Sequence, residues 1–143
     1  ELYGKNRKEA VKKTGKMIES FGLTAVIKKR AKTLSGGMQR RLSIAMAFIS
    51  SPQILFLDEP TLGLDVIARR ELWGVVKKLK GKITIILTTH YLEEAEALSD
   101  RIGIMAQGKL KAVGTAGELM ESAGAQKFEE AFIALATGGG VPG

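Results

Sequence analysis

Two adjacent carboxylates, Asp58 and Glu59, follow an apolar run at residues 54–57 and precede Pro60. A short apolar run without alternation is typical of a strand that is covered on both faces, as in a parallel sheet. Neighbouring residues of a strand point to opposite faces, so we expect the two carboxylates to have separate tasks. One suits a hard Mg²⁺ held on phosphates, often through water, and the other suits a base beside an attacking water. In isolation, the pair also fits an acid that caps a helix or a turn.

A second polar corner is formed by Ser35, Gly36 and Gly37, where helical spacing begins. Two glycines let an anion approach the backbone, and the first N–H groups and the dipole of a helix attract it. The Ser35 hydroxyl can donate one more hydrogen bond. The corner therefore indicates an anion-binding turn, with a plain helix-start turn as the alternative.

A third polar group, Thr88, Thr89 and His90, ends a second apolar run at residues 83–88. Ligands of open α/β sheets bind beyond the carboxyl ends of the strands. We therefore expect one sheet edge to gather two carboxylates, two hydroxyls and the only histidine of the chain. A lone histidine is otherwise more often a structural one.

The remaining pattern alternates helices with strands. Apolar spacing and capping residues predict helices over residues 7–21, 36–50, 66–80, 92–98 and 126–136, and strands over 54–58, 83–88, 102–106 and 110–113. In the helix over 66–80 we expect Asp65 as the N-cap and Leu72, Val75, Val76 and Leu79 facing inward. Thr115 and Glu118 have the spacing of a capping box that begins a further helix. In the first two helices the residues expected to be buried are Val11, Thr14, Ile18, Phe21, Met38, Leu42, Ala45, Met46 and Ile49. This order predicts an α/β fold with a parallel sheet. The Gly-rich residues 138–143 are predicted to be disordered.

Composition restricts the class of protein. The 143 residues suit one ordinary domain or part of one, and no apolar run approaches the length of a membrane span. The chain has no Cys, which excludes a disulfide framework. Residues 1–41 carry 12 Lys and Arg against 3 Asp and Glu, so the positive charge is concentrated there. Because no aromatic residues interleave with these basic runs, we expect no direct nucleic-acid binding.

Together the three polar groups resemble the motifs of the ATP-binding cassette (ABC) ATPases. In chain order these are the signature motif at Leu34-Ser35-Gly36-Gly37-Met38-Gln39, the Walker B motif at Leu55-Phe56-Leu57-Asp58-Glu59-Pro60-Thr61, the D-loop at Gly63-Leu64-Asp65 and the H-switch at Thr88-Thr89-His90. The resemblance covers residues from about 10 to 122 and is greatest to the ATPase subunits of transporters, particularly exporters. It implies the α/β core of a P-loop NTPase, here in part, with part of the helical subdomain and a C-terminal β-hairpin and helices.

The resemblance implies ATP and Mg²⁺ as ligands and gives three residues catalytic roles. Asp58 would organise Mg²⁺ through water, Glu59 would polarise the attacking water, and His90 would contact the γ-phosphate.

The same resemblance implies a head-to-tail dimer of ATPase subunits. Ser35, Gly36 and Gly37 would bind the γ-phosphate of a nucleotide held by the second subunit, with Met38 in the position where the family most often has Gln. Asp65 would cross the interface and align the two sites.

The phosphate-cradling pattern G-x-x-x-x-G-K-[ST] does not occur in the sequence. The pairs Gly15-Lys16, Gly81-Lys82 and Gly108-Lys109 all lack the upstream Gly and the following Ser or Thr. The chain therefore resembles the C-terminal portion of the domain, without the Walker A region. We expect the missing neighbour strand to leave an apolar sheet edge uncovered, and the fragment to be inactive alone.

Three segments are expected: residues 1–51 as part of the helical subdomain, 52–123 as the C-terminal part of the ATPase core, and 124–143 as a C-terminal helix and tail. A transmembrane permease would hold the subunit at the cytoplasmic face of the membrane. The alternatives are a non-transport ABC ATPase that acts on DNA or ribosomes, and a catalytically silent interaction fragment.

Overall fold

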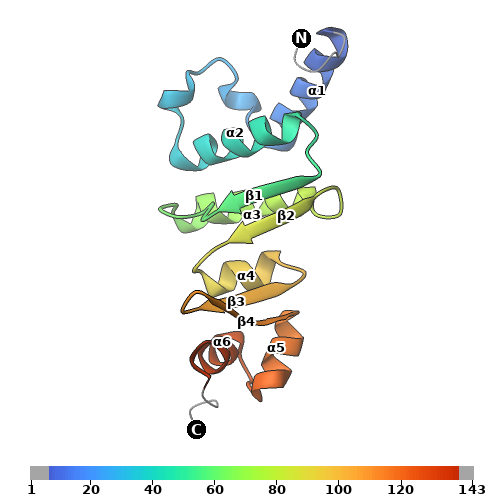
Figure 1. Ribbon diagram of the computed structural model, residues 1–143. Coiled ribbons are helices and arrows are strands. Elements are labelled where there is room, and N and C mark those ends of the chain that lie inside the picture. The colour runs from blue at the N-terminus through green and yellow to red at the C-terminus, as the bar shows by residue number, and fades with distance from the viewer. Residues whose placement is uncertain (1–6, 139–143) are drawn as a thin grey trace. The chain divides into compact units, whose positions relative to one another are not determined.

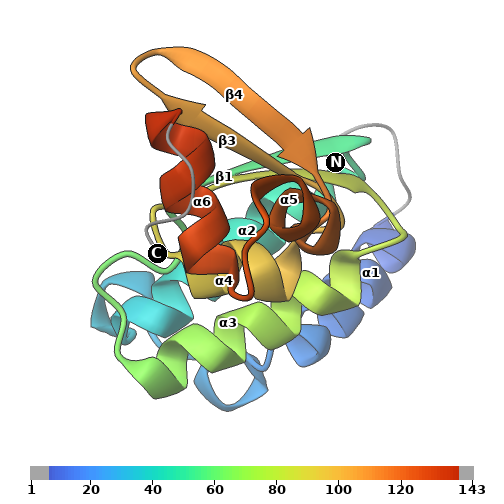
Figure 2. The same ribbon diagram turned by 90° about the horizontal axis from the view of Figure 1, so that it is seen from below.

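The computed structural model describes residues 7–138 of the chain, which form two compact units that divide between Thr88 and Thr89. Figures 1 and 2 show their helices and strands. In the described part of the chain, no helix has both the length and the apolar character needed to cross a membrane.

The first unit is a parallel strand pair backed by helices. It contains α1 (Arg7–Ser20), α2 (Gly36–Ile49), β1 (Ile54–Asp58), α3 (Val66–Leu79) and β2 (Thr84–Thr88), with short 3-10 turns at Thr24–Val26 and Ala31–Thr33. The predicted parallel pairing is confirmed, with Ile54 opposite Thr84 and Asp58 opposite Thr88. The three helices lie on the same side of the two strands (Figure 2).

This one-sided cover sets the burial of β1. Leu55 and Leu57 are buried, whereas Ile54 is 51% exposed and Phe56 is 71% exposed. The expectation of a strand covered on both faces is therefore wrong for the described chain, where burial alternates with the pleat. The result is an exposed apolar face, to which Ile86 of β2 also contributes.

Helix α3 supplies most of the core of this unit. The four residues predicted to face inward, Leu72, Val75, Val76 and Leu79, are buried, and so is Trp73. Asp65 is the N-cap, as predicted. The helix ends before Gly81, whose φ of 76° lies in the left-handed region that favours glycine.

Helix α2 is present as predicted, but its buried face is only partly the expected one. Ala45 is buried as expected, whereas Met46 is 67% exposed, Ile49 is also exposed, and Ile44 is buried in addition. A Cβ built on Gly37 would lie 3.0 Å from the Cβ of Ala68 in α3, so the two helices approach closely there. This contact, rather than the apolar spacing alone, sets the rotation of α2.

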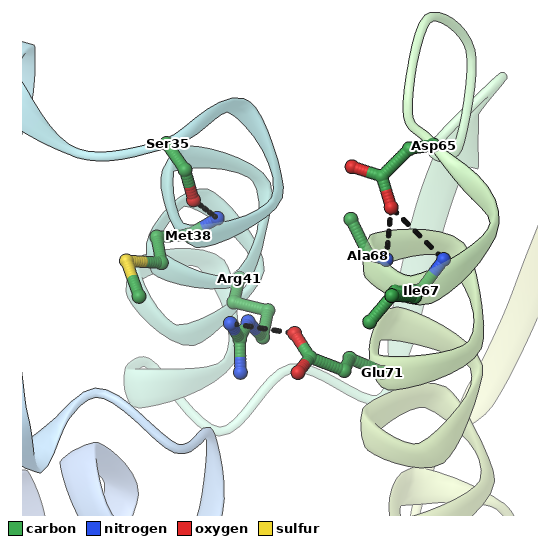
Figure 3. A network of polar contacts seen from close by, with 7 residues as sticks. All are labelled: Ser35, Met38, Arg41, Asp65, Ile67, Ala68 and Glu71. Atoms are coloured by element: carbon green, nitrogen blue, oxygen red, sulfur yellow. Dashed lines mark hydrogen bonds and ion pairs between the residues drawn. The ribbon is translucent and has the colours of Figure 1, made fainter.

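An ion pair joins the same two helices further along their axes. Arg41 Nη2 lies 3.0 Å from Glu71 Oε2, and the Arg41 side chain is only 12% exposed (Figure 3). In the preceding helix α1, the expected inward face is also only partly confirmed, because Val11 is exposed whereas Met17 and Phe21 are buried.

The second unit packs a β-hairpin against three helices. It contains α4 (Leu92–Leu98), β3 (Ile102–Ala106), β4 (Lys109–Gly114), α5 (Ala116–Ala123) and α6 (Phe128–Thr137). The hairpin is antiparallel, with a register shift between Ile104 and Met105. Its core is formed by Ile102, Ile104, Leu119 and Phe128.

The ends of the helices in this unit follow local sequence chemistry. Thr115 and Glu118 form the predicted capping box of α5. The hydrogen bonds from the backbone and side chain of Thr115 lower the pKa of the Glu118 carboxyl. Gly138 ends α6 with a φ of 72°, and the rest of the tail predicted to be disordered, residues 139–143, lies outside the described residues.

We expect the Phe56→Ser substitution to reduce self-association of the chain, because it removes the largest exposed side chain from the uncovered apolar face. Sedimentation velocity at increasing protein concentration measures the effect. Met46→Ser is the matched control, since Met46 is similarly exposed but lies on a helix. Equal reduction by both variants would show that the sheet face has no special part in association.

Gly37→Ala should lower the free energy of unfolding of the first unit by about 1–2 kcal/mol relative to Gly36→Ala. The reason is the rigid Ala68 Cβ at 3.0 Å, whereas a Cβ at Gly36 meets only the Leu64 Cδ2 at an ordinary 3.5 Å. Urea unfolding followed by Trp73 fluorescence measures both, since this buried tryptophan is the only one in the chain. Indistinguishable midpoints would mean that the helices separate at no cost.

Candidate functional site

The carboxyl ends of β1 and β2 bring Asp58 and Thr88 together. The two residues are opposite each other in the parallel register. The Thr88 hydroxyl donates a short hydrogen bond to Asp58 Oδ1, and the Asp58 side chain remains exposed. This edge therefore presents a fixed carboxylate to solvent, as a metal held beyond the strand ends requires.

Glu59 has an unusual backbone conformation. Its φ is 45°, in the left-handed region that a residue with a Cβ adopts at a cost of roughly 1–2 kcal/mol. The Glu59 N–H donates to the Thr88 carbonyl at 2.9 Å, and the Glu59 carbonyl accepts from the Leu62 N–H at 3.1 Å. These bonds hold the residue in a tight turn directly after the strand.

Because of this turn, the separate placement of the Asp58 and Glu59 carboxylates has another cause than the pleat of the strand. Strand β1 ends at Asp58, so the pleat does not set the direction of the Glu59 side chain, and the expectation from strand alternation is corrected on this point. Glu59 is partly buried whereas Asp58 is exposed. The partly buried Glu59 carboxylate fits a base, and the exposed Asp58 carboxylate fits a ligand of a cation.

The Ser35 corner caps α2. Ser35 Oγ accepts the Met38 N–H at 3.3 Å, which leaves the hydroxyl hydrogen available to donate (Figure 3). Ser35 and Gly36 are exposed, Gly37 is buried against α3, and Met38 is partly buried. The Gln39 side chain donates to the Leu34 carbonyl at 3.1 Å and so fixes the turn that precedes the helix.

Asp65 caps α3 in the same manner. Its Oδ1 accepts the N–H groups of Ile67 at 2.9 Å and Ala68 at 3.0 Å. Asp65 is exposed, and its second carboxylate oxygen makes no hydrogen bond with the described residues. The cap alone accounts for an Asp at this position, but it leaves one oxygen available for another molecule.

The two capped helix starts lie at the same end of the α2–α3 pair. Figure 3 shows Ser35 and Asp65 at this end, with the Arg41–Glu71 ion pair further down the two helices. Arg41 and Glu71 are the residues that we did not assign from the sequence. The sequence held a weak signal for this ion pair, because Arg41 follows the Ser35 cap at the same spacing as Glu71 follows the Asp65 cap.

His90 belongs to the second unit. Its ring is exposed and packs on the ring of Tyr91, with the centroids 4.2 Å apart and the planes at 40°. The Tyr91 N–H donates to Thr89 Oγ1 at 3.0 Å, so the turn that carries His90 is ordered locally. The role of His90 beside the carboxylates of the first unit stays a prediction.

The oxygen atoms at the strand ends fit Mg²⁺ in kind. Asp58 and Thr88 provide a carboxylate and a hydroxyl, which are hard ligands. Between residues 7 and 138, no three His, Asp or Glu side chains converge as a protein-only metal centre would need. A cation at Asp58 would therefore take its other ligands from water and from phosphate oxygens.

Comparisons with known proteins agree on one family. The family model described as ABC transporter matches residues 3–62. The chain is 49% identical over 119 residues to ABC transporter A family member 11 of Arabidopsis thaliana. The aligned residues are 83% of this chain and 12% of that protein. It is 46% identical over 124 residues to the doxorubicin resistance ATP-binding protein DrrA of Mycobacterium tuberculosis. The aligned residues are 86% of this chain and 38% of DrrA.

A third relative is the human phospholipid-transporting ATPase ABCA3, which is 42% identical over 125 residues, or 87% of this chain and 7% of that protein. Among solved structures, an ATP-binding subunit of an ABC transporter matches with a TM-score of 0.75 and 29% identity, over 93% of this chain and 57% of that one. The chain thus spans well under half the length of these three curated relatives. Its α/β fold with a parallel sheet is consistent with part of a P-loop NTPase core, and the chain belongs to the ABC transporter family, as part of an ATPase nucleotide-binding domain.

Proposed function

We propose that the chain is part of a subunit that binds and hydrolyses ATP to power an ABC transporter. The observation that carries this proposal is the edge of β1 and β2, where Asp58 is held by Thr88 and Glu59 is held in a left-handed turn. Such an arrangement separates an exposed cation ligand from a partly buried base. The transporter names of the relatives support the same reading.

Two tasks near the nucleotide would fall to different residues: binding of the cation that neutralises phosphate charge, and acceptance of a proton from the attacking water. Asp58 would hold Mg²⁺ through water, and the cation would neutralise charge on the phosphates. Glu59 would orient the attacking water and accept its proton, while His90 would contact the γ-phosphate. The rigid turn at Glu59 supports this role, because a base acts efficiently only when its position is fixed.

The capped helix starts would serve a second subunit. The exposed Ser35 hydroxyl and the first N–H groups of α2, at Gly36 and Gly37, suit the γ-phosphate of a nucleotide bound by a partner. Met38 would lie at the edge of this contact. The second oxygen of Asp65 is placed for a contact across the interface of a head-to-tail dimer.

A transmembrane permease would complete the assembly and hold the subunit at the cytoplasmic membrane face. The names of DrrA and ABCA3 refer to doxorubicin resistance and to phospholipid transport, and they favour export over import. The same names favour transport over action on DNA or ribosomes. Residues 1–51, 52–123 and 124–143 would be the helical part, the core part and the C-terminal part of the subunit.

A second candidate function is a catalytically silent interaction fragment. The observation that favours it is the absence of G-x-x-x-x-G-K-[ST] from the 143 residues. Without backbone N–H groups and a lysine to hold the β- and γ-phosphates, most of the usual affinity for ATP is missing.

We expect residues 1–143 alone to bind ATP weakly and to hydrolyse it at a negligible rate, because the phosphate-holding loop is missing. Isothermal titration with ATP and Mg²⁺, beside a phosphate-release assay, measures both quantities. Tight binding that requires Mg²⁺ would contradict this expectation and would point to a different nucleotide site.

Catalysis by Glu59 is tested in a chimera in which residues 1–143 replace the aligned segment of DrrA, since the two proteins are 46% identical there and this segment is 38% of DrrA. Glu59→Gln should slow ATP hydrolysis by roughly 10²–10⁴-fold, the usual weight of a positioned base, and leave ATP binding intact. Glu121→Gln, on the exposed surface of α5, is the matched control. Hydrolysis at the rate of the unsubstituted chimera would remove Glu59 from the mechanism, and an inactive chimera would favour the silent fragment.

A further inference from the structure

An open cavity of about 280 Å³ lies in the first unit, away from the Ser35 corner and the acidic strand ends. It is formed by the second half of α1, the end of α2 and the second half of α3. Its floor is apolar and consists of Met17, Phe21, Val75 and Leu79, all of which belong to the buried core. The ring of Phe48 lies beside Phe21, with the centroids 6.4 Å apart.

Four lysines and no acidic residue line this cavity. Lys13 Nζ donates to the Ile49 carbonyl at 2.7 Å and to the Ser51 hydroxyl, and Lys78 Nζ donates to the Ser20 carbonyl at 3.4 Å. These two lysines therefore have partners that hold them at the rim. The Ser20 carbonyl carries no full charge, so this contact does not neutralise the Lys78 ammonium.

The other two lysines, Lys16 and Lys82, make no hydrogen bond or ion pair with any residue in the described part of the chain. Lysines near the end of a helix are often explained by the helix dipole. That explanation suits Lys78, in the last turn of α3, but not Lys16 inside α1 or Lys82 beyond the helix. The ammonium groups of Lys16 and Lys82 thus belong to a cavity with an apolar floor and have no partner between residues 7 and 138.

We propose that this cavity, the lysine pocket, binds an anionic lipid of a membrane surface. The apolar floor would take the start of an acyl chain, and Lys16 and Lys82 would hold the phosphate of the headgroup. Lysine suits this task because its ammonium is a compact charge that needs no fixed bidentate geometry. An ordered apolar surface ringed by lysines is the arrangement by which proteins lie on anionic bilayers.

The four lysines of the pocket favour an anionic ligand, and the burial of its aromatic rings argues against single-stranded nucleic acid. Single-stranded nucleic acid needs exposed aromatic faces on which bases stack. Of the two rings that line the pocket, Phe21 is 2% exposed and Phe48 is partly buried beside it, so neither offers an open face to a base. The lipid site is independent of the proposed ATPase function, because none of its residues belongs to the nucleotide motifs.

The test uses residues 1–143 with Phe56→Ser, so that the exposed sheet face does not insert into lipid. Binding is measured by flotation with vesicles of phosphatidylcholine alone and with phosphatidylglycerol added. We expect binding only to the anionic vesicles and a loss of at least about tenfold in the Lys16→Glu/Lys82→Glu variant. Trp73 fluorescence and circular dichroism confirm that each variant is folded.

The matched control is Lys28→Glu/Lys29→Glu, which changes the net charge equally on exposed lysines outside the pocket. Its affinity should fall by less than about threefold. Equal losses in the two double variants would overturn the proposal, since the attraction would then depend on net charge alone. Binding to phosphatidylcholine at equal strength, or to neither vesicle, would overturn it too.

Soluble competitors identify the source of the anion. Decyl phosphate should displace the vesicles, whereas inorganic phosphate at the same concentration and a glutamate-rich peptide should not. Displacement by either of the latter would replace the lipid with a free phosphate or an acidic protein segment and overturn the proposal. Ser20→Leu, which narrows the pocket without a charge change, should weaken decyl phosphate binding severalfold.

Discussion

The parallel register of β1 and β2 is the constraint on which the candidate site depends. Because Asp58 lies opposite Thr88, the hydroxyl of one strand end holds the carboxylate of the other, and the Thr88 carbonyl receives the Glu59 N–H. A slip of one residue would move Leu57 to the position of Asp58 and turn the buried leucines outward. The same register thus sets both the burial of Leu55 and Leu57 and the position of the carboxylate at the strand end.

The close approach of α2 and α3 extends this constraint to the Ser35 corner. Gly37 allows the helices to meet near their capped ends, and Arg41 and Glu71 join them again further along. The two contacts hold the polar caps at Ser35 and Asp65 at the same end of the helix pair. The glycine that could be read as a ligand-binding residue therefore also has a packing role, and the two roles are compatible because a small residue serves both.

Much of the fold could be predicted because local signals were strong. Apolar spacing located the helices of the described residues, and Asp65 and Thr115 mark helix starts by their capping chemistry. The buried face of α2 could not be predicted in the same way, because Gly37 contributes nothing to an apolar pattern although its contact with Ala68 rotates the helix. The open face of β1 depends on which neighbours cover it, and apolar residues alone do not report that. For the site, the types and order of the residues were predictable, but the Thr88–Asp58 bond and the Arg41–Glu71 pair join positions thirty residues apart.

The left-handed backbone of Glu59 has a consequence for how this position can vary. Glycine, asparagine and aspartate adopt such a conformation with less strain than glutamate. Selection for folding alone would therefore favour drift of position 59 toward one of these shorter residues, and only a benefit from the longer carboxylate opposes that drift. In a set of natural variants, the residue at this position would distinguish lineages that retain the chemistry from lineages that keep only the scaffold.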